Sequence, residues 1–177
     1  DFKGNLLSSS RVLASGYTSS PDWSSAGSQT TLSAIESAAA SQLLIETFTT
    51  AKTYDALNRV TSITTPDTTV YTPTYNEASQ LKAVDVNIRG APTATNFVSH
   101  IEYNARGQRT EIDYVGTTPA FKTTYTYEAE TFRLSRQITR LTSTNQKAQD
   151  GALTYDPVGN IVEIDDNADQ TIYFSGT

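Results

Sequence analysis

The stretch Tyr103-Asn104-Ala105-Arg106-Gly107-Gln108-Arg109 decides the fold, because versions of it recur along the chain. Alternating residues rich in Thr and Tyr come before such stretches and a second alternating run follows, which is the pattern of two β-strands. Asn104 can open a turn by hydrogen-bonding its own backbone, and Gly107 can adopt a positive φ. The stretch therefore predicts a β-hairpin with a turn of four or five residues.

This hairpin pattern is repeated. Copies led by Tyr lie 21, 28, 24 and 28 residues apart, and Asp1–Leu7 fits the same frame without its Tyr. Hairpins at this spacing predict an all-β fold, in which antiparallel hairpins form a curved sheet strip. The residues that we assign to the structural repeat motif are Tyr54, Asp55, Asn58, Tyr75, Asn76, Tyr103, Asn104, Gly107, Tyr127, Tyr155, Asp156 and Gly159.

The pattern divides the chain into three segments. We expect a truncated first hairpin over residues 1–17, an insertion over 18–46 and repeat hairpins over 47–177. Within the insertion, the composition of 18–31 predicts a loop, and the spacing of Leu32, Ile35, Ala39 and Leu43 predicts a short helix over 32–46. Residues 90–96 and 143–150 are expected to form longer loops.

Composition excludes several classes of protein. The chain has 177 residues and a net charge of −6, with one His and no Cys or Met. Without Cys it has no disulfide framework, thiolate nucleophile or Cys-bound metal. The acidic net charge disfavours nucleic-acid binding. The chain contains no run of about 18 apolar residues, so we expect no membrane insertion by this segment. A Met-free chain that starts with Asp is expected to be part of a longer protein.

Individual candidates for chemistry have simpler structural explanations. Asp55 and Asp156 occupy turn-opening positions, and His100 is a lone His in a strand run, with no Ser or Cys partner signature. Asp165, Asn167 and Asp169 resemble the start of a calcium loop, but Gln170 and Gly176 stand where that loop needs Gly and Glu. The arginines at 133, 136 and 140 are expected to pair with acids. We therefore expect no enzyme, no catalytic, cofactor-binding or metal-binding residue, and no cofactor.

The motif Tyr-Asp-x-x-Gly-Asn/Arg-hydrophobic resembles the YD repeat of RHS-repeat proteins, above all the repeat region of the insecticidal toxin complex B/C (TcB-TcC) component. The best copies are Tyr54–Val60, Tyr103–Arg109 and Tyr155–Ile161. This resemblance implies a secreted or extracellular bacterial protein, in which the strip is part of a shell that encloses a toxin polypeptide. It also implies partners: flanking repeats or identical copies that pair through edge strands. The self-cleaving aspartyl site that follows the repeats in that family has no counterpart here, so no catalytic residue is carried over.

A second interpretation stays open. Related repeats also serve adhesion, and an extracellular adhesion or surface-fibre module would use the same hairpins for self-association or glycan contact. The sequence does not separate shell from fibre. An enzyme is disfavoured, because the motifs of nucleophilic, metal and phosphate chemistry are missing.

Overall fold

The computed structural model describes residues 1–16, 18–115 and 120–168, and it confirms the all-β prediction. Eleven strands follow one another in the sheet in chain order, with β1 and β11 at the two ends of that order. The strands are β1 (Ser8–Ala14), β2 (Leu43–Tyr54), β3 (Val60–Thr64), β4 (Val70–Tyr75), β5 (Leu81–Asn87), β6 (Thr95–Tyr103), β7 (Arg109–Tyr114), β8 (Phe121–Tyr127), β9 (Leu134–Leu141), β10 (Lys147–Tyr155) and β11 (Ile161–Asp166). Because each strand adjoins its sequence neighbour, the order needs only antiparallel connections. No helix within the described ranges is long and apolar enough to span a membrane.

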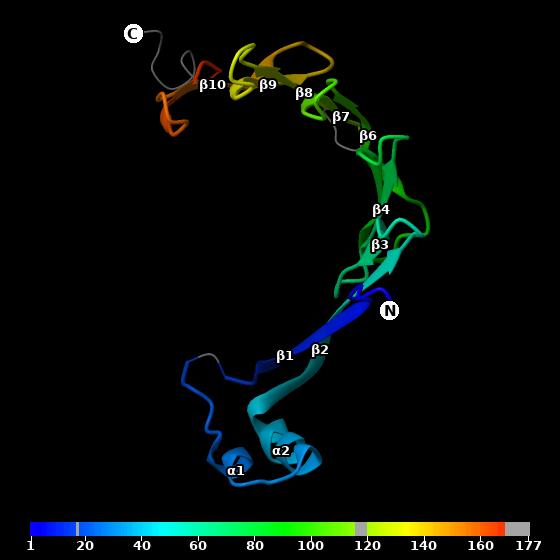
Figure 1. Ribbon diagram of the computed structural model, residues 1–177. Coiled ribbons are helices and arrows are strands. Elements are labelled where there is room, and N and C mark those ends of the chain that lie inside the picture. Colours follow the sequence, from blue (N-terminus) through cyan, green and yellow to red (C-terminus); the bar gives the residue numbers. More distant parts are fainter. Residues whose placement is uncertain (17, 116–119, 169–177) are drawn as a thin grey trace. The chain divides into compact units, whose positions relative to one another are not determined.

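The chain forms two compact units, Asp1–Val70 and Tyr71–Thr177. In the first unit, β1 pairs with β2 and β2 with β3. The segment between β1 and β2 carries the short helices α1 (Ser24–Gly27) and α2 (Leu32–Ala39) and the 3₁₀ turn η1 (Ala40–Gln42). Figure 1 shows α1 and α2 beyond the ends of β1 and β2.

This insertion corrects two predictions. The loop expected over 18–31 contains α1, and the helix expected over 32–46 ends early. Residues 43–46 belong to β2, because Leu43 pairs with Ala14 and the strand continues through Ile45 and Thr47, whose branched side chains favour extended backbone. Pairing with β1 therefore overrides the helical spacing of Leu43.

The second unit contains β4 apart from Val70, the strands β5 to β11 and one further 3₁₀ turn, η2 (Ile88–Gly90). Two expected loops are shorter than predicted. Thr95 pairs with Val86 at the start of β6, and Lys147 pairs with Arg140 at the start of β10. Polar composition at 147–150 suggested a loop, whereas main-chain pairing with β9 makes it a strand.

The sheet of the second unit has two chemically different faces. Register pairing places His100, Asp113, Lys122, Arg140 and Lys147 in one row across β6 to β10, which we call the charged face. The adjacent row, Ile101, Ile112, Thr123, Thr139 and Gln149, lies on the opposite side, which we call the neutral face. Ile101, Ile112 and Thr123 are buried.

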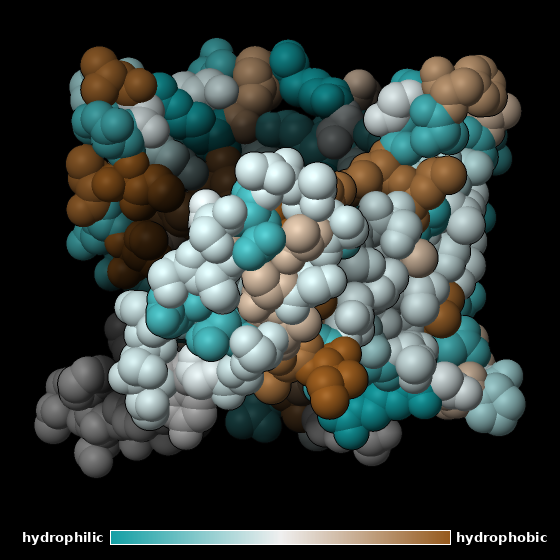
Figure 2. Space-filling model, turned by 90° about the horizontal axis from the view of Figure 1, so that it is seen from below, coloured by the Kyte–Doolittle hydropathy of each residue, from teal (hydrophilic) through white to brown (hydrophobic). Residues whose placement is uncertain are grey.

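Burial elsewhere is sparse. Besides Ile101 and Ile112, Ala26 and Val86 are the only hydrophobic residues buried among the described residues, whereas many large hydrophobic residues are exposed. Ile45, Val158 and Ile164 are among the exposed ones. Figure 2 shows the same mixture, with hydrophobic residues reaching the surface beside hydrophilic ones. Hydrogen bonding between neighbouring hairpins must therefore supply much of the order that a thick core would otherwise provide.

Candidate functional site: the repeat turns

Five turns that begin with Asp or Asn share one geometry, and we call them the repeat turns: residues 1–5, 55–59, 76–80, 104–108 and 156–160. The turn 65–69 closes with the same main-chain hydrogen bond but begins with Thr65. In the last four repeat turns, the first residue donates its main-chain N–H to the carbonyl of the fifth, at 2.9 Å in each case. Each of those four follows a Tyr that ends a strand. These Tyr residues are Tyr54, Tyr75, Tyr103 and Tyr155.

The first side chain of each repeat turn caps the turn. Asp55 Oδ1 accepts the main-chain N–H groups of Leu57 and Arg59, both at 2.9 Å. Asn104 Oδ1 does the same for Arg106 and Gln108, at 3.0 and 3.1 Å. An oxygen in this place satisfies donors that the tight turn leaves unpaired. The N–H of Arg59 holds the pKa of Asp55 below its usual value, so the carboxylate stays charged.

The fourth residue of every repeat turn has a positive φ, between 61° and 102°. These residues are Gly4, Asn58, Ser79, Gly107 and Gly159. A type I turn followed by a left-handed residue is the usual way to close a three- to five-residue hairpin loop. The motif residues Asn58, Gly107 and Gly159 therefore stand where the backbone needs them.

The first and fifth side chains also bind each other. Where the first is Asp, the fifth is a donor: Arg59 Nε lies 2.7 Å from Asp55 and Asn160 Nδ2 lies 2.8 Å from Asp156. Where the first is Asn, the fifth is Gln, and Asn104 Nδ2 donates to Gln108 Oε1 at 2.9 Å. Asn76 and Gln80 repeat this second arrangement at 3.2 Å. The sequence motif contains Asn or Arg at this fifth position, but the contact of its side chain with the first residue was not predicted.

The Tyr hydroxyls connect each repeat to the preceding one. Tyr103, Tyr127 and Tyr155 each donate a hydrogen bond of 2.8 Å, to the main-chain oxygens of Leu81, Arg109 and Leu134. Tyr54 donates to Leu6 at 3.2 Å. In all four cases the acceptor is the main-chain oxygen of the first residue after the preceding turn.

A β-bulge accompanies these tyrosines. The register shifts immediately before Tyr54, Tyr103, Tyr127 and Tyr155. A bulge bends its strand, increases the local twist and re-aims a side chain. The bulge thus accounts for a Tyr that reaches across to the neighbouring hairpin.

Successive turns also touch side by side. Within the first unit, Lys3 Nζ donates to the carbonyl of Ala56 at 2.8 Å, and Asn5 Nδ2 donates to Asn58 Oδ1 at 3.0 Å. Within the second, Gln108 Nε2 donates to the carbonyl of Phe132 at 2.7 Å. These hydrogen bonds join neighbouring turns directly and are additional to the hydrogen bonds that pair the strands.

The turn after Tyr127 departs from the shared geometry. It runs from Glu128 to Arg133 and is one residue longer, with a positive φ of 60° at Phe132. The Arg106 guanidinium lies 3.3 Å from the centre of the Phe132 ring, so a cation–π contact holds this residue from the preceding turn. Arg133 Nη1 then donates to the carbonyl of Asp156 at 2.9 Å.

The largest electrostatic feature lies outside the repeat turns. Asp150 on β10 has no exposed surface, and its two oxygens accept bonds of 2.6 and 2.7 Å from Nε and Nη2 of Arg136 on β9. The Lys147 ammonium forms a third contact with it. Chiefly because of the Arg136 hydrogen bonds, the pKa of Asp150 falls to about 2. Sequence reasoning predicted acid partners for Arg136 but did not single out Asp150.

The other candidates remain scattered. His100 Nε2 lies 3.3 Å from Oε1 of Glu102 on the same strand, and Arg140 donates to the carbonyl of Asn145. Asp165 and Asn167 are described, whereas Asp169, Gln170 and Gly176 lie outside the described residues. In the ranges that the structure describes, no three His, Cys, Asp or Glu side chains converge on a metal position.

Comparison with known proteins identifies the repeat architecture. No family model matches the chain. It is 31% identical over 143 residues, or 78% of its length, to toxin subunit YenC1 of Yersinia entomophaga, and spans 14% of that protein. Crystal structures of TcdB2-TccC3 and TcdB2-TccC3-Cdc42 match 95% of the chain with a TM-score of 0.75 at 27% identity. A Photorhabdus luminescens Tc holotoxin pore also matches 95%, with a TM-score of 0.75 at 28% identity.

The chain spans about 7% of each of these solved chains, so it corresponds to a small part of them. Sequence similarity, fold similarity and hairpins that follow one another in chain order all agree with the resemblance drawn from the motif. The sequence and fold similarities therefore support an RHS-repeat region of a toxin complex, similar to the repeat region of the insecticidal toxin complex B/C component.

Proposed function

We propose that this chain is a non-catalytic wall segment of an RHS shell that encloses a toxin polypeptide in a secreted bacterial toxin. The residues of the repeat motif hold the wall together. The observation that carries the proposal is the Tyr ladder, in which Tyr103, Tyr127 and Tyr155 each bind the main chain of the preceding hairpin. A wall needs this kind of connection because its hairpins must stay in register without a second layer.

The motif assigns distinct tasks to its members. The first side chain and the left-handed fourth residue close each turn, the fifth side chain locks the first, and the Tyr joins neighbouring hairpins. Lateral contacts such as Lys3 with Ala56 add a second connection along the turns. A division into wall hairpins and an insertion fits this role: β1 and the strands from β2 onward belong to wall hairpins, and the segment between β1 and β2 that carries α1 and α2 is the insertion.

The partners follow from the same construction. In β1, six of the seven residues are exposed, and it stands at one end of the strand order. A neighbouring repeat of the same protein would pair with such an edge and continue the wall. The polypeptide inside the shell would be the second partner. The relatives named above support a toxin complex, since their names describe a toxin subunit and a holotoxin pore.

The proposal can be tested in a chimera. The 143 matched residues would replace the corresponding region of toxin subunit YenC1, and protease protection of the enclosed polypeptide would be followed by gel electrophoresis. We expect the chimera to protect it as well as the parent. A second chimera with Phe at Tyr103, Tyr127 and Tyr155 should leak at lower temperature. If the first chimera is folded and monodisperse but does not protect the enclosed polypeptide from protease, the wall function is contradicted.

The adhesion alternative is tested separately. A surface fibre would self-associate or bind glycans through exposed aromatic rows. Light scattering over a range of concentrations and a glycan array on the 177-residue chain give the readouts. Saturable glycan binding together with an unprotected chimera would favour adhesion over encapsulation.

A further inference from the structure

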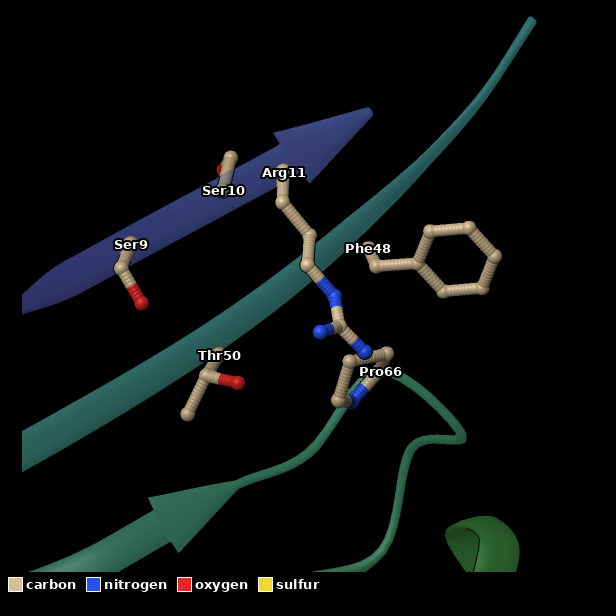
Figure 3. A pocket seen from close by; sticks show the side chains of 6 residues that line it. All are labelled: Ser9, Ser10, Arg11, Phe48, Thr50 and Pro66. Atoms are coloured by element: carbon tan, nitrogen blue, oxygen red, sulfur yellow. The ribbon is translucent and has the colours of Figure 1, made fainter. Parts of the chain in front are cut away.

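A shallow cavity of about 430 Å³ opens on the first unit, where β1, β2 and the turn after β3 meet. Figure 3 shows its lining: Ser9, Ser10 and Arg11 from β1, Phe48 and Thr50 from β2, and Pro66 from the turn. Ser9 pairs with Thr50 and Arg11 with Phe48, so these four side chains share one face of the sheet. Arg11 extends across β2 toward Pro66, and open space separates it from Ser9 and Thr50 (Figure 3).

Arg11 is a cation without an anion. No carboxylate lies within ion-pair distance of it in the part of the chain that the structure describes, and its contact is with the Phe48 ring, 6.0 Å from the guanidinium carbon. Two cations on strands of the second unit do bind carboxylates. Lys122 binds Glu111 at 2.6 Å, and Arg136 binds Asp150 through two nitrogens.

The nearest acid in sequence to the cavity is already engaged. Asp67 follows Pro66, and its carboxylate accepts hydrogen bonds from the hydroxyls of Thr65 and Thr69 at 2.7 and 2.9 Å. The Thr65 hydroxyl, first of all, holds the pKa of Asp67 below its usual value. Asp67 therefore stabilises its own turn instead of neutralising Arg11.

Two hydroxyls complete the polar lining. Neither Ser9 Oγ nor Thr50 Oγ1 forms a hydrogen bond within the described ranges, whereas Ser10 Oγ is paired with Thr49 Oγ1 at 2.9 Å. A planar guanidinium matches a carboxylate with two parallel bonds, and hydroxyls can donate to the same oxygens. The Phe48 and Pro66 rings would contact the short apolar stem that carries the carboxylate.

We propose that this cavity binds the carboxylate of an acidic side chain on a polypeptide that contacts the wall. The occupant is a peptide and not a sugar, because the lining lacks the amide and carboxylate side chains that would bind ring hydroxyls. The inference deepens the proposed function by naming a contact between the wall and its enclosed polypeptide, and it rests on that function for its biological meaning.

The test uses the full chain with ¹⁵N-labelled arginine and observes the Nε–H signal of Arg11 by NMR. The probes are two blocked tripeptides, alanine-glutamate-alanine and alanine-glutamine-alanine, and free glucuronate. We expect the glutamate peptide to bind roughly tenfold more tightly than the glutamine peptide, because only the carboxylate forms charge-assisted bonds with the guanidinium. Binding should weaken as salt is raised.

Variants make the assignment specific. Arg11→Gln should abolish the preference for glutamate, and Thr50→Val should reduce affinity about threefold while the shape is retained. Arg140→Gln is the matched control, since Arg140 lies in the other unit and should leave binding unchanged. Equal affinity for the two peptides, or an unchanged preference in Arg11→Gln, would overturn the proposal. Tighter binding of glucuronate than of the glutamate peptide would also overturn it in favour of a glycan.

These outcomes are independent of the chimera. A protected polypeptide in the chimera together with no glutamate preference would reject the cavity and keep the wall. Glutamate preference with an unprotected polypeptide would keep the cavity and reject the wall.

Discussion

Strands β8 to β11 and the helical insertion between β1 and β2 are ordered by different means. In the first region, the Tyr155 hydroxyl, the Arg133 side chain and the Arg136–Asp150 pair connect successive strands and turns. In the insertion, α2 has no buried residue, and Trp23 and Leu32 are exposed. The repeat region therefore depends on specific polar contacts, whereas the insertion has few contacts to lose.

The difference has a physical origin in layer thickness. A single sheet cannot bury side chains from both faces, so pairing between hairpins carries more of the stability than in a two-layer domain. Asp150 can be fully covered in such a sheet because long neighbouring side chains, Arg136 and Lys147, fold over it. Removing polar contacts should therefore affect β8 to β11 far more than the insertion.

The largest expected effect is that of Asp150→Ala. It leaves the Arg136 and Lys147 charges without their shared carboxylate, and we expect a loss of about 2–3 kcal/mol in the free energy of unfolding. This is below the cost for a fully buried pair, because the Arg136 side chain is 43% exposed. Urea unfolding followed by circular dichroism measures it. A loss under 0.5 kcal/mol would show that β8 to β11 do not depend on this pair.

Protonation of Asp150 at low pH should remove the same stabilising contribution that Asp150→Ala removes. The pKa of Asp150 lies near 2 in the folded chain, below its ordinary 3.8, so its ionised form stabilises the fold at neutral pH. That stability, about 2 kcal/mol, is present above pH 4 and is lost as the pH falls toward 2. Thermal unfolding between pH 5 and 2 should show a smaller acid-induced loss in Asp150→Asn than in the unmodified chain. Parallel curves for the two proteins would contradict this assignment.

A matched pair of glycines compares the two regions directly. Gly159 has a φ of +102°, and a Cβ there would lie 3.0 Å from Arg133 Nη2. Gly159→Ala should therefore cost about 1–2 kcal/mol. Gly27 in α1 has open space around its Cβ position, and Gly27→Ala should be neutral or slightly stabilising. Equal effects in urea unfolding would remove the distinction between the regions.

The sequence predicted the hairpins because their local chemistry is complete within a few residues. Asp55, Asn104 and Asp156 stand at the first turn position, and alternation on either side predicts the strands. Predictions failed where pairing with a distant strand decides the backbone. Leu43 is an example, because its helical spacing is overridden by pairing with Ala14.

The contacts between repeats were harder to predict for a related reason. The acceptor of each Tyr hydroxyl is a main-chain oxygen, which any residue provides, so Leu81 and Leu134 give no sequence pattern. Asp150 was missed because it lies outside the repeat motif and its partner is 14 residues away. The fifth turn position, by contrast, was predictable, since Asn160 and Gln108 follow their partners at a constant spacing.

A smaller effect is expected for Tyr155→Phe, which removes the hydroxyl and leaves the Leu134 carbonyl without that donor. The part-buried site predicts a loss of about 1 kcal/mol. Tyr54→Phe, where the hydrogen bond is longer at 3.2 Å, should cost less and serves as the comparison. Double-mutant analysis of Tyr127→Phe with Tyr155→Phe should give additive losses if each bond joins only its own pair of hairpins. A marked departure from additivity would mean that the ladder acts as one cooperative unit.

The smallest effect should come from the insertion. Leu32 is 72% exposed on α2, so Leu32→Ser removes little buried apolar surface. We expect a change below about 0.5 kcal/mol in unfolding free energy, with the circular dichroism of the sheet unchanged. A loss above 1.5 kcal/mol would mean that this apolar surface packs against something in solution, such as a second copy of the chain. Concentration dependence of the loss would then identify self-association, because only an intermolecular contact weakens on dilution.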